Sequence, residues 1–114
     1  MASLRNANTG KVVAGNVMRA IHWRQRLIGL LPKGHIGPDE GIWFDNCAAV
    51  HTVGMRVPID IIFLDDASRV MRIARSVRSM RFAVACRGAA TVIELGEGAG
   101  VGRGVLVGDR LLLE

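Results

Sequence analysis

The sequence predicts a mainly β fold, a small β-sandwich or partly open, jelly-roll-like barrel of short strands. Short apolar runs alternate with frequent turn residues, with 14 glycines in a chain of 114 residues, and this pattern is typical of all-β domains. Only one segment, at about residues 22–31, has the apolar periodicity of a helix. The length corresponds to a single domain, 1–114. We expect residues 1–10 to form a loosely ordered tail.

Strands are expected at intervals along the whole chain. The first is Lys11 to Ala20, a loosely alternating and valine-rich segment. The strongest is Ile59 to Leu64, because its positions beyond Asp60 are apolar on both faces, as in a central strand covered on two sides. Arg69 to Ala74 would return as the second strand of a hairpin. Further strands are expected at 41–44, 48–52, 82–86, 91–95, 105–107 and 111–113.

Two further segments have a recognisable local pattern. Trp23, Leu27 and Leu30 fall at helical spacing, and Pro32 would end the helix. Glycines alternate strictly from 96 to 104, but the third glycine of the dinucleotide-binding motif is missing and no Gly-Lys-Ser/Thr follows. A flexible turn or a bulged strand crossing is therefore expected at 96–104.

The composition limits the classes of partner and location. The net charge is +5, which favours anionic partners, but aromatic residues make up 4% and tyrosine is absent. The chain thus has little material for stacking nucleic-acid bases, and we expect no nucleic-acid partner. No apolar stretch is long enough for a transmembrane segment or a signal peptide. We expect a cytoplasmic protein, or a mature extracytoplasmic form without its leader.

Several segments together resemble a known family. The most specific is the block from Cys47 to Asp60, and the others are Gly29-Leu30-Leu31, Gly41 to Phe44, Phe63-Leu64-Asp65, Cys86 to Ala89, Ile93-Glu94-Leu95 and Gly108-Asp109. The chain resembles the family catalogued as domain of unknown function one-ninety-two, an uncharacterised family of bacteria and archaea. The resemblance extends from about Trp23 onward; the family's usual Gly-Leu-Met ends here in Leu31. It implies a mainly β, sandwich-like domain with one short helix, and it implies no activity.

Polar residues that an apolar core does not require gather between Cys47 and Asp60. The candidate ligand-binding residues are His51, Thr52, Met55, Arg56, Asp60, Cys47 and Cys86. Asp60 lies at the mouth of an apolar strand, so its carboxylate must be hydrogen-bonded to backbone amides, to Thr52 or His51, or to a ligand. The segment is therefore either a polar clasp that fixes a turn or a small polar pocket.

The thiols and His51 allow three interpretations. Four residues of straight strand would separate the Cα atoms of Cys47 and His51 by roughly 13 Å, too far for both to bind one metal ion unless a turn intervenes or Cys86 and Asp60 contribute. We expect no metal and no other cofactor. A thiol beside His51, oriented by Asp60, would be a catalytic arrangement. The third interpretation is that both cysteines are small buried apolar residues, or form a disulfide if their Cα atoms lie within about 7 Å.

Arginines recur at every third position, at Arg69, Arg72, Arg75, Arg78 and Arg81. No regular element brings all five to one face, so most of them are expected to be solvated. The favoured function is a non-catalytic module that binds a small molecule or a protein through the Cys47 to Asp60 segment. The alternatives are an enzyme that uses His51 and Asp60 with Cys86 or Cys47, and a basic interaction protein that uses the Arg69 to Arg81 edge.

Overall fold

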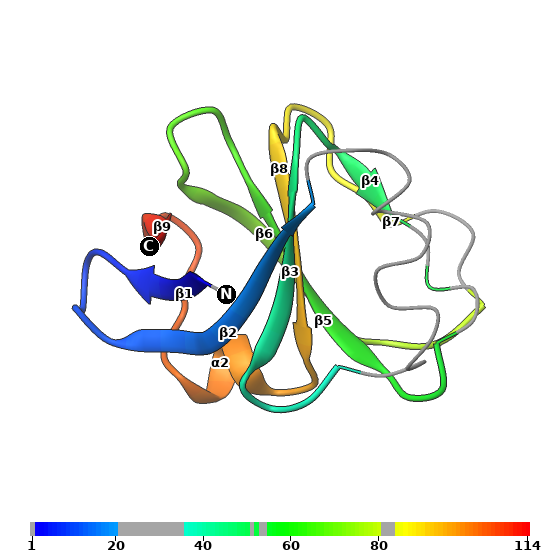
Figure 1. Cartoon of the computed structure of the whole chain (residues 1–114). Coiled ribbons are helices and arrows are strands. Elements are labelled where there is room, and N and C mark those ends of the chain that lie inside the picture. The colour runs from blue at the N-terminus through cyan, green and yellow to red at the C-terminus, as the bar shows by residue number, and fades with distance from the viewer. Residues whose placement is uncertain (1, 21–35, 51, 53–54, 81–83) are drawn as a thin grey trace.

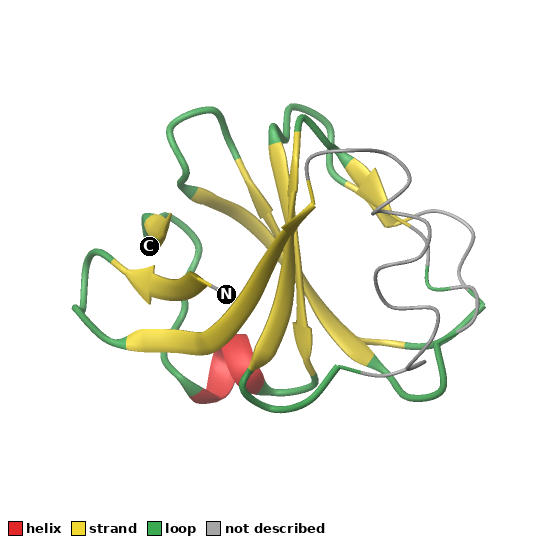
Figure 2. Ribbon diagram, in the orientation of Figure 1, coloured by secondary structure: helices red, strands yellow, loops and turns green. Residues whose placement is uncertain are grey.

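The computed structural model describes residues 2–20, 36–50, 52, 55–80 and 84–114 (Figure 1). A seven-stranded sheet has the order β6-β5-β8-β3-β2-β1-β9, and a second sheet pairs β4 with β7 (Figure 2). The elements are β1 (Ala2–Asn6), β2 (Val12–Ala20), β3 (Glu40–Asp45), β4 (Ala49–Val50), β5 (Ile59–Leu64), β6 (Val70–Val77), β7 (Val84–Ala85), β8 (Thr91–Gly96), α2 (Ala99–Gly102) and β9 (Leu111–Leu113). The prediction of a mainly β fold is confirmed.

The two edges of the large sheet approach each other without closing it. β6 and β9 are joined by an isolated antiparallel bridge between Arg69 and Arg110. Near it, the Val70 amide donates to the Asp109 carbonyl at 2.8 Å and the Leu111 amide donates to the Ser68 carbonyl at 3.0 Å. The sheet therefore curls so that its first and last strands meet at one point, while most of β6 remains an edge strand.

The strand β5 explains why Ile59 to Leu64 is apolar at almost every position. It lies between β6 and β8, and all six of its residues are buried. Apolar clusters pack on both faces of the sheet, one containing Ile62 and Leu64, the other Ile59 and Ile61. A strand with its two faces covered has no solvent side on which to place polar residues, so the predicted central strand is confirmed.

The two faces are named here after the carboxyl group that each contains. The Asp60 face holds the cluster Leu4, Val13, Ala14, Val17, Trp43, Ile62, Leu64, Val70, Ile93, Leu95, Ala99, Val105 and Leu111. The Glu94 face holds the cluster Ala20, Ile36, Ile42, Phe44, Met55, Ile59, Ile61, Phe63, Ala74, Val77, Val84 and Val92. Side chains alternate between the faces along each strand, and this places Asp60 with Ile62 and Glu94 with Val92.

Three local predictions were wrong. The described part of the segment 1–10 does not form a loose tail, because Leu4 and Asn6 are fully buried and β1 pairs with both β2 and β9. Residues 105–107 form no strand: they enter a turn, closed by the Leu106 amide that donates to the Asp109 carboxylate at 3.0 Å. The glycine-rich stretch contains a single helical turn, α2, rather than only a loop.

Other predictions are confirmed with shifted bounds. The valine-rich segment is β2, which is the second strand and not the first, and it pairs in parallel with β3. The hairpin of β5 and β6 is antiparallel, as expected. The helix predicted at 22–31 lies outside the described residues. In the described part of the chain, no helix has the length and hydropathy needed to cross a membrane.

Candidate functional site

Asp60 is a buried carboxylate that is fully engaged by the backbone. It is 1% exposed. Its Oδ1 accepts a hydrogen bond from the Ser76 amide at 2.9 Å, and its Oδ2 accepts one from the Gly98 amide at 2.8 Å. The β5–β6 register slips at this position, and Ser76 has a positive φ of 49°. Of the partners considered for Asp60, the structure contains backbone amides, which tie the β6 bulge to the turn before α2.

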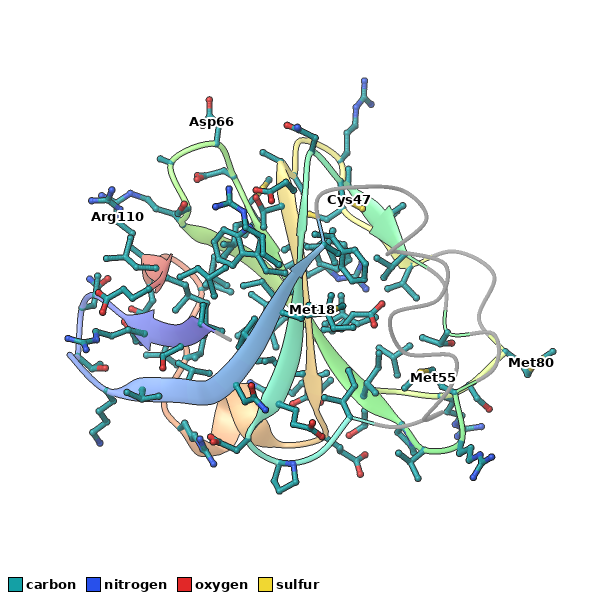
Figure 3. All side chains as sticks on the ribbon, viewed as in Figure 1. Met18, Cys47, Met55, Asp66, Met80 and Arg110 are labelled. Carbon is teal, nitrogen blue, oxygen red and sulfur yellow. The ribbon has the colours of Figure 1, made fainter. Side chains whose placement is uncertain are left out.

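Thr52 forms a second polar clasp, on a different part of the molecule. Its side chain is buried, and Oγ1 donates to the Arg78 carbonyl at 2.6 Å. Its own carbonyl accepts from the amides of Met55 at 3.1 Å and Met80 at 3.2 Å. Figure 3 shows Met55 and Met80 at the same end of the molecule. The clasp therefore holds Thr52 against Arg78 and Met80, in the segment that follows β6.

The predicted site residues that the structure describes do not all lie on one face of the sheet. Met55 is buried in the cluster of the Glu94 face, whereas Asp60 lies on the opposite face of the sheet. Arg56 is exposed to solvent. His51 lies outside the described residues. A strand side chain can reach only one face, so Asp60 cannot line a pocket with Met55.

The two cysteines border the Glu94 face. Both are half-buried free thiols that pack against its cluster. The Cys47 thiol donates to the Ala49 carbonyl at 3.0 Å, and the Cys86 amide donates to the Ala48 carbonyl at 3.0 Å, which holds the two segments side by side. Among the described residues, no three His, Cys, Asp or Glu side chains are grouped closely enough to hold a metal ion. Figure 3 labels Cys47 beside β4.

The arginine series is divided among different environments. Arg72 donates to the Ala85 carbonyl at 2.8 Å, and its guanidinium lies 5.7 Å from the centre of the Phe63 ring. Arg69 donates to the Gly108 carbonyl at 3.4 Å. Arg75 and Arg78 are exposed on and just after the edge strand β6, and Arg81 lies outside the described residues. The series therefore does not form one continuous basic stripe.

Glu94 is a buried carboxyl group that the sequence reasoning did not select as a site residue. It is 3% exposed and lies in β8, opposite Ile42 of β3 and Ile61 of β5. The same row continues to Met18 of β2 and Ala74 of β6. Glu94 is thus the central member of a row of five side chains across five strands, and the other four are apolar. Figure 3 labels Met18, which lies over the middle of the sheet.

The rows on either side of Glu94 enclose it further. One row consists of Ala20, Phe44, Val92, Phe63 and Arg72. In the other direction, Gly96 lies against the Ile36–Gly37 backbone, because a Cβ on Gly96 would come within 2.5 Å of the Gly37 carbonyl oxygen. The segment at 36–37 therefore closes that end of the face.

The two sheet carboxyls differ in their hydrogen-bond partners. No group among the described residues donates a hydrogen bond to Glu94, whereas Asp60 accepts two. Burial raises the pKa of Glu94 from its usual 4.5 to about 8, because the charged form loses its hydration without gaining a partner. At neutral pH the group is therefore mostly a neutral carboxylic acid. Buried polar groups without partners are uncommon in native proteins and require an explanation.

One sequence signal for Glu94 was available. An acidic residue lies between Ile93 and Leu95 in a strand that was correctly predicted at 91–95. The sequence does not reveal that the two neighbouring strands each place an isoleucine beside Glu94. Those contacts come from Ile42 and Ile61, which are distant in sequence.

The match to a protein family covers almost the whole chain. The family model of DUF192, described as "Uncharacterized ACR", matches residues 4–113. The chain belongs to the DUF192 family. The match includes Asp60, Glu94 and the block from Cys47 to Asp60, and it confirms the resemblance noted in the sequence. A search of curated proteins finds no match to this DUF192 chain.

Solved structures share the fold of this DUF192 protein. A "putative transcription regulator" from Sinorhizobium meliloti 1021 has a TM-score of 0.80 and 25% identity, covering 98% of this chain and 91% of that chain. A protein of unknown function from Novosphingobium aromaticivorans DSM 12444 has a TM-score of 0.76 and 23% identity, covering 97% of this chain and 82% of that chain. A "putative exported protein" from Burkholderia pseudomallei K96243 has a TM-score of 0.52 and 14% identity, covering 99% of this chain and 24% of that chain.

Proposed function

We propose that this DUF192 protein is a non-catalytic binding module and that the Glu94 face is its ligand site. The observation that carries the proposal is the Glu94 carboxyl, which is 3% exposed and has no hydrogen-bond donor among the described residues. Small-molecule sites are typically apolar, with a few polar groups that orient the ligand. A single carboxyl in a row with Met18, Ile42 and Ile61 has this character.

The comparison with Asp60 supports a ligand rather than a purely structural role. Asp60 is equally buried, and two backbone amides satisfy it. Among the described residues, no group satisfies the Glu94 carboxyl, and a buried polar group without a partner costs about 1–3 kcal/mol of stability. A ligand with one polar group and an apolar body would recover that cost, because it would satisfy Glu94 while it contacts the apolar row.

The segment from Cys47 to Asp60 also contributes residues to the proposed site. Met55 and Cys47 contact the same cluster as Ile42 and Ile61, so the segment would border the ligand. The carboxyl group proposed to contact the ligand is that of Glu94 and not that of the candidate Asp60. The ligand would be a small molecule, since the face is interior to the protein and Glu94 is almost completely removed from water.

The alternative functions have less support. An enzyme that pairs Asp60 with a thiol requires a free carboxylate near the cysteines, but both Asp60 oxygens accept backbone hydrogen bonds on the opposite face of the sheet. A basic interaction surface would rely on Arg75 and Arg78, because Arg69 and Arg72 donate to carbonyls of the chain itself. The description "putative transcription regulator" is that of the Sinorhizobium protein, and we propose no nucleic-acid contact for this one.

The proposal predicts that small apolar probes bind at the Glu94 face. In NMR titrations with 1-hexanol and hexylamine, we expect at least one probe to shift the methyl signals of Ile42 and Ile61 saturably. Those of Ile62 and Ile93, on the Asp60 face, should not move. Glu94→Leu should weaken the better probe at least fivefold, which is the contribution of roughly one hydrogen bond.

A matched control removes one methyl group from the other face of the sheet. Ile62→Val alters the Asp60 face of β5 and should leave the probe affinity unchanged. Binding of neither probe, or equal shifts on the two faces, would contradict the proposal.

A further inference from the structure

We infer that the Glu94 face selects a ligand with a positively charged aliphatic amine, whose ammonium group pairs with the Glu94 carboxylate. This inference rests on the proposed function and specifies the ligand class of the same site. Two observations support it. Glu94 lies at the centre of an apolar row, and the described charged groups near it bind other partners.

The other acidic groups on the strands next to Glu94 already have hydrogen-bond donors, so they would not compete with Glu94 for the ammonium group of a ligand. On β3, Glu40 accepts a hydrogen bond from the Gly37 amide at 2.9 Å, and Asp45 accepts hydrogen bonds from Arg19 at 2.7 and 3.0 Å. On β5, Asp60 belongs to the opposite face and is satisfied there by backbone amides. These carboxylates therefore have donors of their own.

The remaining titratable groups on this side are a guanidinium and two thiols. Arg72 of β6 lies in the row next to that of Glu94, but its guanidinium donates to the Ala85 carbonyl and covers the Phe63 ring. Cys47 and Cys86 pack at the border of the cluster. Within the described ranges, no cation forms an ion pair with Glu94. The described residues therefore supply no counter-charge for Glu94, and we propose that a ligand supplies it.

Among ligand classes, an amine gains the most from this arrangement. An anion would bring a second set of acceptor atoms to a group that can offer only one donor. A neutral alcohol would form an ordinary hydrogen bond. An ammonium group forms charge-assisted hydrogen bonds, which are about twice as strong. Its attraction to the carboxylate is strengthened because the apolar row excludes water. An alkyl body would meet Ile42, Ile61 and Met18 in the same row.

Binding of an amine releases a proton from Glu94, whereas binding of a neutral ligand does not. Burial raises the pKa of Glu94 to about 8, so the free protein holds a proton on Glu94 at pH 7. Pairing with ammonium breaks the O–H bond of the acid, and the proton passes to the buffer. The amine keeps its own proton, since aliphatic amines have a pKa near 10.4. We expect release of about 0.9 proton per bound amine at pH 7 and about 0.1 at pH 9.

The test is isothermal titration calorimetry with hexylamine and 1-hexanol, in buffers of different ionisation enthalpy. Wild-type protein should bind hexylamine at least tenfold more tightly than 1-hexanol and release about 0.9 proton at pH 7. Glu94→Gln should lose the amine preference and the proton release, yet bind 1-hexanol within about twofold of wild type. Glu94→Asp, which keeps a carboxyl group, should retain the amine preference and the proton release.

The possible failures are distinguishable. If 1-hexanol binds as tightly as hexylamine and neither releases a proton, the amine inference is wrong and the binding function stands. If neither probe binds to wild-type protein, the proposed function fails as well. Retention of the wild-type methyl spectrum at Ile62 and Ile93 in Glu94→Gln will establish that a loss of binding does not arise from unfolding.

Discussion

Replacing Glu94 with leucine is expected to raise the free energy of unfolding by about 3 kcal/mol at pH 7 in the absence of ligand. The leucine side chain is apolar like the neighbouring Ile42 and Ile61. It also removes a group whose pKa is raised by burial from 4.5 to about 8, and each pH unit of that difference corresponds to about 1.4 kcal/mol. A binding residue that lowers stability is expected where a site is built for its ligand and not for the free protein.

The sign of the pH dependence follows from which state holds the proton. Below about pH 4.5, Glu94 is protonated in both the folded and the unfolded protein, and it carries no ionisation penalty. As the pH rises from 4.5 to about 8, the unfolded chain loses this proton while the folded protein keeps it. The contribution of Glu94 to the free energy of unfolding therefore falls by up to about 1.4 kcal/mol per pH unit. It stops changing above about pH 8, when both states are ionised.

Urea unfolding of wild type and Glu94→Leu between pH 5 and pH 9 measures this effect. The stability difference between the two proteins should widen with pH up to about pH 8 and then level off. Glu97→Leu is the matched control, because it makes the same change at an exposed position of the adjacent turn, where we expect an effect within about 0.5 kcal/mol. A stability difference that is absent, or that does not vary with pH, would contradict the burial of an unpartnered carboxyl.

Asp60→Ala is expected to have a large effect in the opposite direction, a loss of about 3–5 kcal/mol. The substitution removes the buried acceptor of the Ser76 and Gly98 amides. Each hydrogen bond to a carboxylate contributes about 1.5–3 kcal/mol. Ser76 also has a positive φ of 49°, an unfavourable conformation for a residue with a Cβ, and the Asp60 hydrogen bond helps to hold it.

Denaturant unfolding at pH 7 and hydrogen exchange at the two amides test the Asp60 prediction. The Ser76 and Gly98 amides should lose protection in Asp60→Ala. Asp66→Ala is the control, since Asp66 is exposed at the tip of the β5–β6 turn (Figure 3), and we expect it to change stability by less than about 0.5 kcal/mol. A loss below about 1 kcal/mol for Asp60→Ala would show that solvent or other groups replace the carboxylate.

The parts of the fold that the sequence predicts are those set by local pattern. The apolar run at Ile59–Leu64 indicated a strand covered on two sides, and β5 has these bounds. The need of a buried carboxylate for partners correctly indicated that Asp60 would be hydrogen-bonded. Both inferences use only the neighbours of a residue along the chain.

The parts that the sequence did not predict depend on contacts between distant segments. β1 is ordered because Leu4 and Asn6 pair with Leu113 and Leu111 at the other end of the chain. The proposed anchor Glu94 is unusual because of Ile42 and Ile61 on flanking strands. A local pattern identifies a polar residue in an apolar strand, but only the sheet order determines which face it occupies and whether any donor reaches it.

The central claim is that Glu94 is buried with no partner among the residues that the structure describes, and NMR titration of its side-chain carboxyl carbon tests this most directly. The signal can be assigned by comparison with Glu94→Gln. We predict a single titration with a midpoint near pH 8, because burial favours the neutral acid. A midpoint near 4.5 would mean that the carboxyl is solvated or paired in the free protein, and it would remove the basis for a ligand site on this face of the sheet.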